Sequence, residues 1–427
     1  MEVSFVKKLL IPITCILVFF IVICLGHEAY AKIYIDIDSP ALRQFPMALY
    51  DFGEDKIGQE LTGIVRNDLE FTRLFYFVRK EAFIEEKGDD FNPADWSPIG
   101  VEAVLKGDIT VTDKINVVVR LYDVVETKII LYKQYISAKP ALRSLAHRIS
   151  NDIYYALTGR KGIFNTKIAF VSKGSKIKEL VMMDFDGARL HKTGFRKSMM
   201  LALHASADGS SLIISASGGR QWSIYLLNFT KGSVRRIFSS KGINIAGDFF
   251  SGGKSFVFSS SKDGSPDIYV FDIASGRSRR LTSSYWIDIS PSLSPDDRSI
   301  AFVSDRSGNP NIYTMSINGD NVQRVTFEDK YNTSPSWSPA GDLIAYSGLV
   351  KGKNQIFTVK PDATNARQLT DSGNNEEPDF SPDGRFITFT SDRDGYKAIY
   401  IMTTGGENQR RVSPHGYRAF GPEWLSN

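Results

Sequence analysis

A short apolar run that ends in serine recurs along most of this 427-residue chain at a nearly fixed interval. The six terminal serines are Ser172, Ser215, Ser259, Ser304, Ser347 and Ser391. Successive copies are 43, 44, 45, 43 and 44 residues apart. A period of this size, with four short strand-like runs in each unit, is typical of a β-propeller in which every repeat forms one blade.

The two ends of the repeat array indicate how the ring closes. The first unit has no turn-bearing first strand before Ile168, whereas residues 421–426 match the first strands of the other units. We therefore predict an all-β propeller of six blades over residues 161–427, in which strand 421–426 completes the first blade. This arrangement protects a sheet edge that could otherwise pair with other chains. The alternative is an open, solenoid-like array.

The first 31 residues have the pattern of an export signal. Lys7 and Lys8 precede an apolar run over residues 9–25, and a small-x-small motif ends at Ala31. We expect cleavage after Ala31, and the alternative is an uncleaved membrane anchor. Both cysteines, Cys15 and Cys24, lie in the apolar run, so the mature chain cannot form disulfides.

Residues 32–160 predict a mixed α/β domain. Strands are expected over residues 32–38, 45–52 and 74–78, and apolar residues at helical spacing predict a helix over 54–71. A short helix over 99–105 and two paired strands over 107–124 and 128–138 follow. An apolar stripe over 140–157 predicts a closing helix that ends at Gly159.

Motifs for catalysis or metal binding are missing from the mature sequence. Its four histidines, His147, His191, His204 and His415, do not have metal-ligand spacing, and no GxSxG motif occurs. Along the expected inner strands the sequence offers Leu203, His204, Phe249, Leu293, Trp337, Phe380 and Trp424. Only His204 is a candidate for chemistry there, so we predict a non-enzyme with no metal and no cofactor. The alternative is an exported hydrolase or a sugar-binding propeller that uses its central channel.

One face of the predicted propeller has the longer loops, which follow the second strands or join successive blades. Exposed aromatic and arginine residues on a rigid rim are common in protein interfaces. The candidate partner-binding residues on these loops are Arg220, Trp222, Tyr285, Trp286, Asp305, Arg306, Tyr331, Asn332, Asp392, Arg393 and Tyr417. The Asp-Arg pairs at 305–306 and 392–393 could instead stabilise their own loops. The basic residues of this half are dispersed and the chain is exported, which argues against nucleic acid as a partner.

The combined pattern resembles the TolB family of the Tol-Pal envelope system. The resemblance rests on the start KIYIDIDSPALRQFPMALYDF, the helix IGQELTGIVRNDLEFTRLFYFV, the join HRISNDIYYALTGRKGIFNTKIAFVS and the SPDG turns with SDRxGxxxIY loops. Residues 206–209 and 250–255 depart from the SPDG pattern in the second and third blades.

The resemblance implies a periplasmic, non-enzymatic adaptor. In this family the propeller face docks the peptidoglycan-associated lipoprotein Pal, and a mobile N-terminal arm contacts the inner-membrane protein TolA. The system draws in the outer membrane at cell division and maintains outer-membrane integrity. The matching arm here comprises Lys32, Ile33, Tyr34, Ile35, Asp36, Ile37 and Asp38. An ordinary edge strand is the alternative for this segment. We expect a monomer that reaches the membrane only through its partners.

Overall fold

The computed structural model describes residues 35, 43–174, 176–219, 221–327 and 331–426. The chain divides into two compact units, Met1–Lys161 and Gly162–Asn427. The predicted export signal, its cleavage site at Ala31 and the predicted strand over 32–38, except Ile35, lie outside the described residues.

None of the helices in the described part of the chain has the length and hydrophobicity needed to cross a bilayer.

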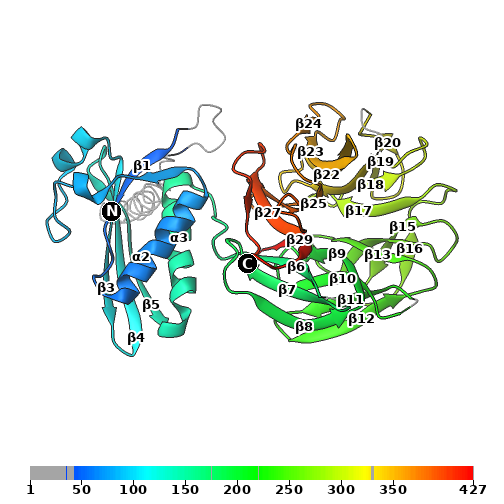
Figure 1. Ribbon diagram of the computed structural model, residues 1–427, viewed down its shortest axis with the longest axis horizontal. Coiled ribbons are helices and arrows are strands. Elements are labelled where there is room, and N and C mark those ends of the chain that lie inside the picture. The colour runs from blue at the N-terminus through cyan, green and yellow to red at the C-terminus, as the bar shows by residue number, and fades with distance from the viewer. Residues whose placement is uncertain (1–34, 36–42, 175, 220, 328–330, 427) are drawn as a thin grey trace, which may run out of the picture. The chain divides into compact units, whose positions relative to one another are not determined.

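The N-terminal unit is a five-stranded sheet with the strand order β2-β1-β3-β4-β5. Its strands are β1 (Phe45–Leu49), β2 (Phe75–Phe77), β3 (Ala103–Val111), β4 (Lys114–Asp123) and β5 (Lys128–Ala138). β1 runs parallel to both β2 and β3, and the remaining pairs are antiparallel. Two helices, α2 (Lys56–Phe71) and α3 (Leu142–Thr158), lie side by side on one face of the sheet (Figure 1).

Both helices follow the apolar spacing of the sequence. α2 begins after Asp55, whose Oδ1 accepts a hydrogen bond from the backbone N–H of Gly58 at 2.7 Å. α3 ends at Gly159, which adopts a left-handed backbone with φ 69° and donates its N–H to the carbonyl of Tyr155. Fully buried side chains on each helix, such as Leu61 and Ile153, face the sheet and form the core.

The prediction for residues 99–124 is wrong in two respects. Only a 3₁₀ turn, Ser97–Ile99, forms where a helix was expected, and it ends at Gly100 with φ 73°. Residues 107–124 are not one strand, because β3 and β4 form a hairpin that reverses beside Asp113. β3 is a central strand whose first residues are buried on both faces, and a continuous apolar run of this kind does not distinguish a strand from a helix.

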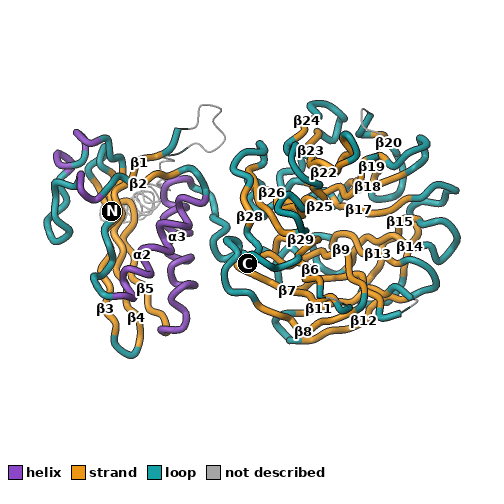
Figure 2. Tube along the Cα trace, viewed as in Figure 1, coloured by secondary structure: helices purple, strands orange, loops and turns teal. Residues whose placement is uncertain are grey.

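The second unit confirms the predicted six-bladed propeller. It consists of six four-stranded antiparallel sheets arranged around a centre (Figure 1), and its described residues form only strands and loops (Figure 2). Blades one to three contain β6 (Lys167–Lys173), β7 (Lys178–Asp184), β8 (His191–Lys197); β9 (Met199–Ala205), β10 (Ser211–Ser217), β11 (Ser223–Asn228), β12 (Ser233–Ser239); β13 (Asn244–Phe249), β14 (Ser255–Ser260), β15 (Asp267–Asp272) and β16 (Ser278–Arg280).

Blades four to six repeat the pattern, and the last strand of the chain belongs to the first blade. Their strands are β17 (Asp288–Leu293), β18 (Ser299–Ser304), β19 (Asn311–Ser316), β20 (Gln323–Arg324); β21 (Asn332–Trp337), β22 (Ile344–Val350), β23 (Lys353–Val359), β24 (Arg367–Gln368); β25 (Asn375–Phe380), β26 (Phe386–Ser391), β27 (Ala398–Thr403) and β28 (Arg410–Arg411). β29 (Ala419–Leu425) pairs with β6 and gives the first sheet the order β29-β6-β7-β8.

The closing strand is fixed by its side chains as well as by its backbone. Trp424, opposite Ile168 in the antiparallel register, is only 4% exposed and stacks against Phe386 of the sixth blade. Its indole N–H donates a hydrogen bond of 2.7 Å to the hydroxyl of Thr166. One residue of β29 therefore contacts both the first and the last blade.

We predict that Trp424→Ala lowers the free energy of unfolding of the propeller by about 3–5 kcal/mol, because it empties a large buried volume at the ring closure. Trp424→Phe, which mainly removes the hydrogen bond to Thr166, should cost about 1 kcal/mol. Urea unfolding measures both. The control Trp286→Ala, at a half-exposed tryptophan, should stay within about 0.5 kcal/mol of wild type. A loss for Trp424→Ala no larger than that of the control would contradict this role.

Candidate functional site

The inner strands of the propeller surround a cavity of about 250 Å³. Each of these strands contributes one side chain at the equivalent position of the repeat, and all six residues line the cavity. They are His204, Asp248, Ser292, Ser336, Asp379 and Glu423. A further carboxylate, Glu377, also lines it. We call the six residues the channel ring.

The channel ring corrects the prediction that only His204 offers chemistry on the inner strands. In five of the six inner strands, the sequence interpretation named the apolar residue that follows the ring residue and overlooked the ring residue itself. Asp248 precedes Phe249, and Asp379 and Glu423 precede Phe380 and Trp424 in the same way. Because neighbouring residues of a strand point to opposite sides, a buried aromatic residue in the blade implies that the preceding residue faces the channel.

Ring side chains connect neighbouring blades. A side-chain oxygen of one ring residue accepts a hydrogen bond from a backbone N–H in the next blade. That N–H belongs to the residue directly after the ring residue of the next blade. Four such bonds join Asp248 to Leu293 at 2.8 Å, Ser292 to Trp337 at 3.2 Å, Asp379 to Trp424 at 2.6 Å and Glu423 to Ala205 at 2.6 Å. The last two attach the closing strand β29 to the sixth and second blades. The carboxylates of the ring thus have a structural role.

The carboxyl groups of the ring differ in the direction of their pKa shifts. Burial alone would raise the pKa of Asp248, but the imidazole of His204, whose Nδ1 lies 2.6 Å away, and hydrogen bonds from Ser292 and Leu293 keep it below its ordinary value. Burial raises the pKa of Asp379 to about 7, with a further increase from the charge of Asp248. Burial and the charges of Asp379 and Asp248 raise the pKa of Glu423 well above its ordinary value.

The cavity can therefore hold protons or a polar ligand. Within the described ranges, no group of three histidine, cysteine, aspartate or glutamate side chains is arranged to hold a metal ion. Ser292 donates a hydrogen bond to Asp248 at 2.7 Å, and the same carboxylate contacts Nδ1 of His204 at 2.6 Å.

The loop face presents three of the predicted partner-binding residues to solvent. Tyr285 is fully exposed, and Trp286 and Tyr331 are 48% and 45% exposed. Two apolar neighbours that the sequence interpretation did not select, Ile287 and Phe327, are also exposed. These five residues lie on the connections that enter and leave the fourth blade, and we call them the aromatic patch.

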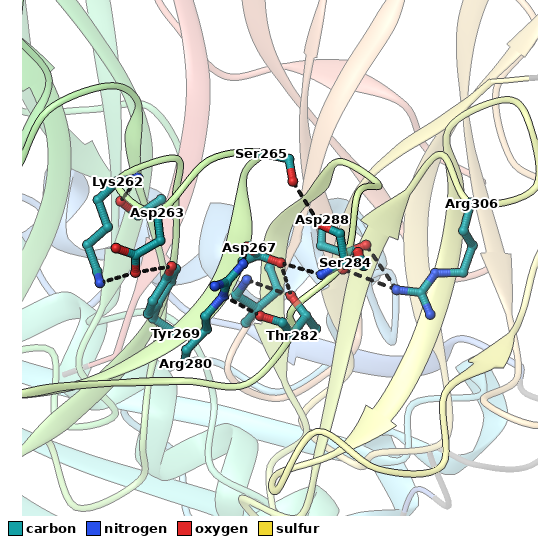
Figure 3. A network of polar contacts seen from close by, with 12 residues as sticks. Lys262, Asp263, Ser265, Asp267, Tyr269, Arg280, Thr282, Ser284, Asp288 and Arg306 are labelled. Atoms are coloured by element: carbon teal, nitrogen blue, oxygen red, sulfur yellow. Dashed lines mark hydrogen bonds and ion pairs between the residues drawn. The ribbon is translucent and has the colours of Figure 1, made fainter.

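The loop that carries Tyr285 and Trp286 is held at both ends by polar contacts (Figure 3). On one side, the backbone N–H of Ser284 and the hydroxyl of Thr282 donate to Asp267, and Ser265 donates to the carbonyl of Ser284 at 2.8 Å. Asp267, which is fully buried, also forms an ion pair with Arg280. This side fixes the start of the loop.

Arg306 and Asp305 fix the other end of the same loop. The guanidinium of Arg306 contacts both carboxylate oxygens of the fully buried Asp288, at 3.0 and 3.1 Å (Figure 3). The carboxylate of Asp305 accepts the backbone N–H of Ile287 at 2.8 Å. Two exposed aromatic side chains are therefore held on a short, preorganised loop, which reduces the entropy lost on binding a partner.

The second Asp-Arg pair makes equivalent contacts in the sixth blade. Arg393 donates to Asn375 at 3.1 Å and to Gln409 at 2.8 Å, and Asp392 accepts the backbone N–H of Asn374 at 2.8 Å. Both pairs tie the loop after a second strand to the connection that enters the same blade. These contacts correspond to the loop-stabilising interpretation of the pairs.

The remaining predicted residues occupy different environments. Asn332 is completely buried and donates to Asn311 at 3.0 Å, so the prediction that it lies on the exposed rim is wrong. Trp222 is half-buried, and its carbonyl accepts a hydrogen bond from Asn244. Tyr417 is half-buried and packs edge-on against Phe170.

Arg220 and all arm residues except Ile35 lie outside the described residues. Ile35 is 5% exposed, and its backbone N–H donates to the carbonyl of Leu157 near the end of α3 at 3.1 Å.

We predict that the propeller of the wild-type protein loses stability relative to Asp379→Asn as pH rises from about 4 to about 8. The carboxyl of Asp379 binds its proton more tightly in the folded chain than in the unfolded chain. Below this pH range both states are protonated, so this tighter binding contributes its full stabilisation to the folded state. That contribution disappears as pH rises through the folded-state pKa. Urea unfolding at several pH values measures it. Asp320→Asn, in an exposed turn, should run parallel to wild type, and a pH-independent difference for Asp379→Asn would contradict the prediction.

Comparison with known proteins assigns both units. The family model of the TolB beta propeller domain matches residues 154–426, and that of the TolB amino-terminal domain matches residues 33–130. The Tol-Pal system protein TolB of Desulfosudis oleivorans is 35% identical over 248 residues, which are 54% of this chain and 56% of that protein. The same protein from Polaromonas sp. is 33% identical over 221 residues, or 51% and 52% of the two chains. The matched regions thus span about half the length of these relatives.

Solved structures extend the likeness to nearly the whole chain. The crystal structure of TolB from Acinetobacter baumannii has a TM-score of 0.82 at 25% identity and covers 90% of this chain and 97% of its own. A chain of a nidogen/laminin complex, with a TM-score of 0.51 and 11% identity, shares the propeller fold alone. Because the family models match both units and the fold agrees over most of the chain, this protein belongs to the TolB family.

Proposed function

We propose that this protein is a non-enzymatic adaptor of the Tol-Pal system in the periplasm. It docks a peptidoglycan-associated, Pal-like lipoprotein on the loop face of its propeller and supports outer-membrane invagination at division and outer-membrane integrity. Membership of the TolB family supports the assignment to the system. The observation that supports docking on this face is the exposure of Tyr285 and Trp286 on a loop that ion pairs of the buried Asp267 and Asp288 hold in place.

Exposed aromatic side chains that are already fixed in position are common at the centres of protein interfaces. The opposite face of the blades carries tight turns, and large exposed apolar side chains are absent from the described turns between first and second strands. The aromatic patch therefore favours one face for the partner.

A second function, hydrolysis or binding of a sugar in the central channel, has one observation in its favour. The channel ring places His204, Asp248, Asp379 and Glu423 around a cavity large enough for a small polar ligand. Against it, the carboxylates are engaged by backbone N–H groups of neighbouring blades.

We predict that Tyr285→Ala combined with Trp286→Ala weakens binding of the Pal-like lipoprotein by about 2 kcal/mol or more, roughly 30-fold in the dissociation constant, because two fixed aromatic contacts are lost. Isothermal titration calorimetry with the purified mature protein measures this. The matched control is Val234→Ala, which truncates an exposed apolar side chain on the outermost strand β12. Equal affinities of the double variant and the control would overturn docking at the patch.

Arg306→Glu and Arg393→Glu are unsuitable for this test. Each substitution would place a carboxylate against Asp288 or Asn375, both fully buried, and would disturb the blade itself. Loss of binding in such variants would not locate the interface. The alanine variants of the aromatic patch leave these buried contacts intact.

We further propose that residues 32–38 form the arm that contacts a TolA-like inner-membrane protein. Deleting these residues should abolish capture of that protein from detergent-solubilised envelope and leave affinity for the lipoprotein within about twofold, since the aromatic patch is unchanged. Co-purification followed by immunodetection of both partners measures the two effects. Retention of the inner-membrane partner by the deletion variant would contradict the proposal.

A further inference from the structure

A second cavity, of about 260 Å³, lies on the loop face where the sixth blade meets the first. It is lined by Lys173, Gly395, Tyr396, Lys397, Arg418 and Phe420. Lys173 is the last residue of β6, residues 395–397 lie in the loop between β26 and β27, Arg418 lies in the connection from β28 to β29, and Phe420 belongs to β29. We call this cavity the basic pocket.

Positive charges converge on the basic pocket. The ammonium of Lys178 lies 4.9 Å from the centre of the Phe420 ring, beside the pocket-lining Lys173, Lys397 and Arg418. Burial lowers the pKa of Lys178, the charges of Lys173 and Lys397 lower it further, and the carboxylate of Glu377 opposes this decrease. In the described parts of the chain, Lys397 pairs with Glu376, but Lys173, Lys178 and Arg418 form no ion pair. Three cations at the pocket therefore have no direct ion-pair partner among the described residues.

The walls of the pocket are held rigidly. The hydroxyl of Tyr396 accepts hydrogen bonds from Arg411 at 2.7 Å and from the backbone N–H of Gly416 at 2.8 Å, and the guanidinium of Arg411 lies 4.8 Å from the centre of its ring. The segments that line the pocket are also joined through their backbones, because Lys173 donates to the carbonyl of Arg418 and Ala419 donates to that of Lys397, both at 2.9 Å. The cations therefore surround a preformed site.

We propose that the basic pocket binds a carboxylate carried on an apolar stem, supplied by an acidic side chain or the chain end of the partner that docks on the loop face. Three unpaired cations provide the counter-charge, and the rings of Tyr396 and Phe420 pack against the stem. A phosphate group has no apolar part to occupy the aromatic walls, so the lining favours a carboxylate. This proposal rests on the proposed docking function.

The pocket and the aromatic patch, on different blades, would together fix the orientation of the partner.

The pocket is tested first with a small probe. NMR of protein labelled with ¹³C at the lysine ε carbons should show saturable shifts of the Lys178 signal on addition of N-acetyl-L-glutamate. N-acetyl-L-glutamine N-methylamide, an analogue without a carboxylate, should produce no saturable shift, and inorganic phosphate should bind at least tenfold more weakly. Arg418→Gln should weaken the response to N-acetyl-L-glutamate, whereas Lys254→Gln, in an exposed turn of the opposite face, should not.

Three results would overturn the pocket assignment. They are no saturable shift with N-acetyl-L-glutamate, an equal shift with N-acetyl-L-glutamine N-methylamide, and tighter binding of phosphate, which would identify a site for phosphate or a lipid headgroup. Thermal unfolding of each variant shows whether a loss reflects misfolding. A charge-conserving variant, Arg418→Lys, should retain the response.

The link to the partner is tested separately by calorimetry with the Pal-like lipoprotein. The double variant Lys178→Gln and Arg418→Gln should bind about tenfold more weakly and with a smaller dependence on salt. The control Lys231→Gln and Lys254→Gln should bind as wild type. If the probe binds but the lipoprotein affinity is unchanged, the pocket's role in docking is wrong while docking itself stands. If the wild-type protein does not bind the lipoprotein at all, the proposed function fails and the probe result is unaffected.

Discussion

Closure of the ring by the C-terminal strand is the contact on which the rest of the propeller depends. The first sheet obtains its inner strand, β29, from residues more than two hundred positions away, and pairing with β6 removes the edges of the array. Bonds from Asp379 and Glu423 then attach β29 to the sixth and second blades. Because these bonds lie in the central channel, the carboxylates of the channel ring help to close the propeller.

This arrangement separates residues that stabilise the propeller from residues available to a partner. Arg306 and Arg393 point into their own blades and hold the connections between them. The connections in turn present Tyr285 and Trp286 to solvent. Rigid support behind an exposed aromatic side chain reduces the conformational entropy lost on binding. In the proposed interface, the buried aspartates therefore assist the exposed aromatic side chains.

Much of the fold could be predicted because its signal is repeated. The period near 44 residues and the unmatched strand at 421–426 were sufficient for six blades, whereas the segment 99–124 occurs once and its buried central strand resembles a helix in composition. The channel ring was missed because its members differ chemically, from His204 to Ser292 to Glu423, although they recur every 43 or 44 residues. The burial of Asn332 and the inward direction of Arg306 depend on partners distant in sequence, Asn311 and Asp288, which residue type alone does not reveal.

The measurement that tests the central claim most directly is site-specific photo-crosslinking in intact cells. A photoreactive phenylalanine analogue at Trp286 should form an adduct with a peptidoglycan-associated lipoprotein, identified by mass spectrometry, because this side chain is exposed on the loop face. The same analogue at Lys254, in a turn of the opposite face, should form none. An adduct from position 254 but not from 286 would contradict docking on the loop face, and no adduct with an envelope protein from either position would contradict the adaptor function.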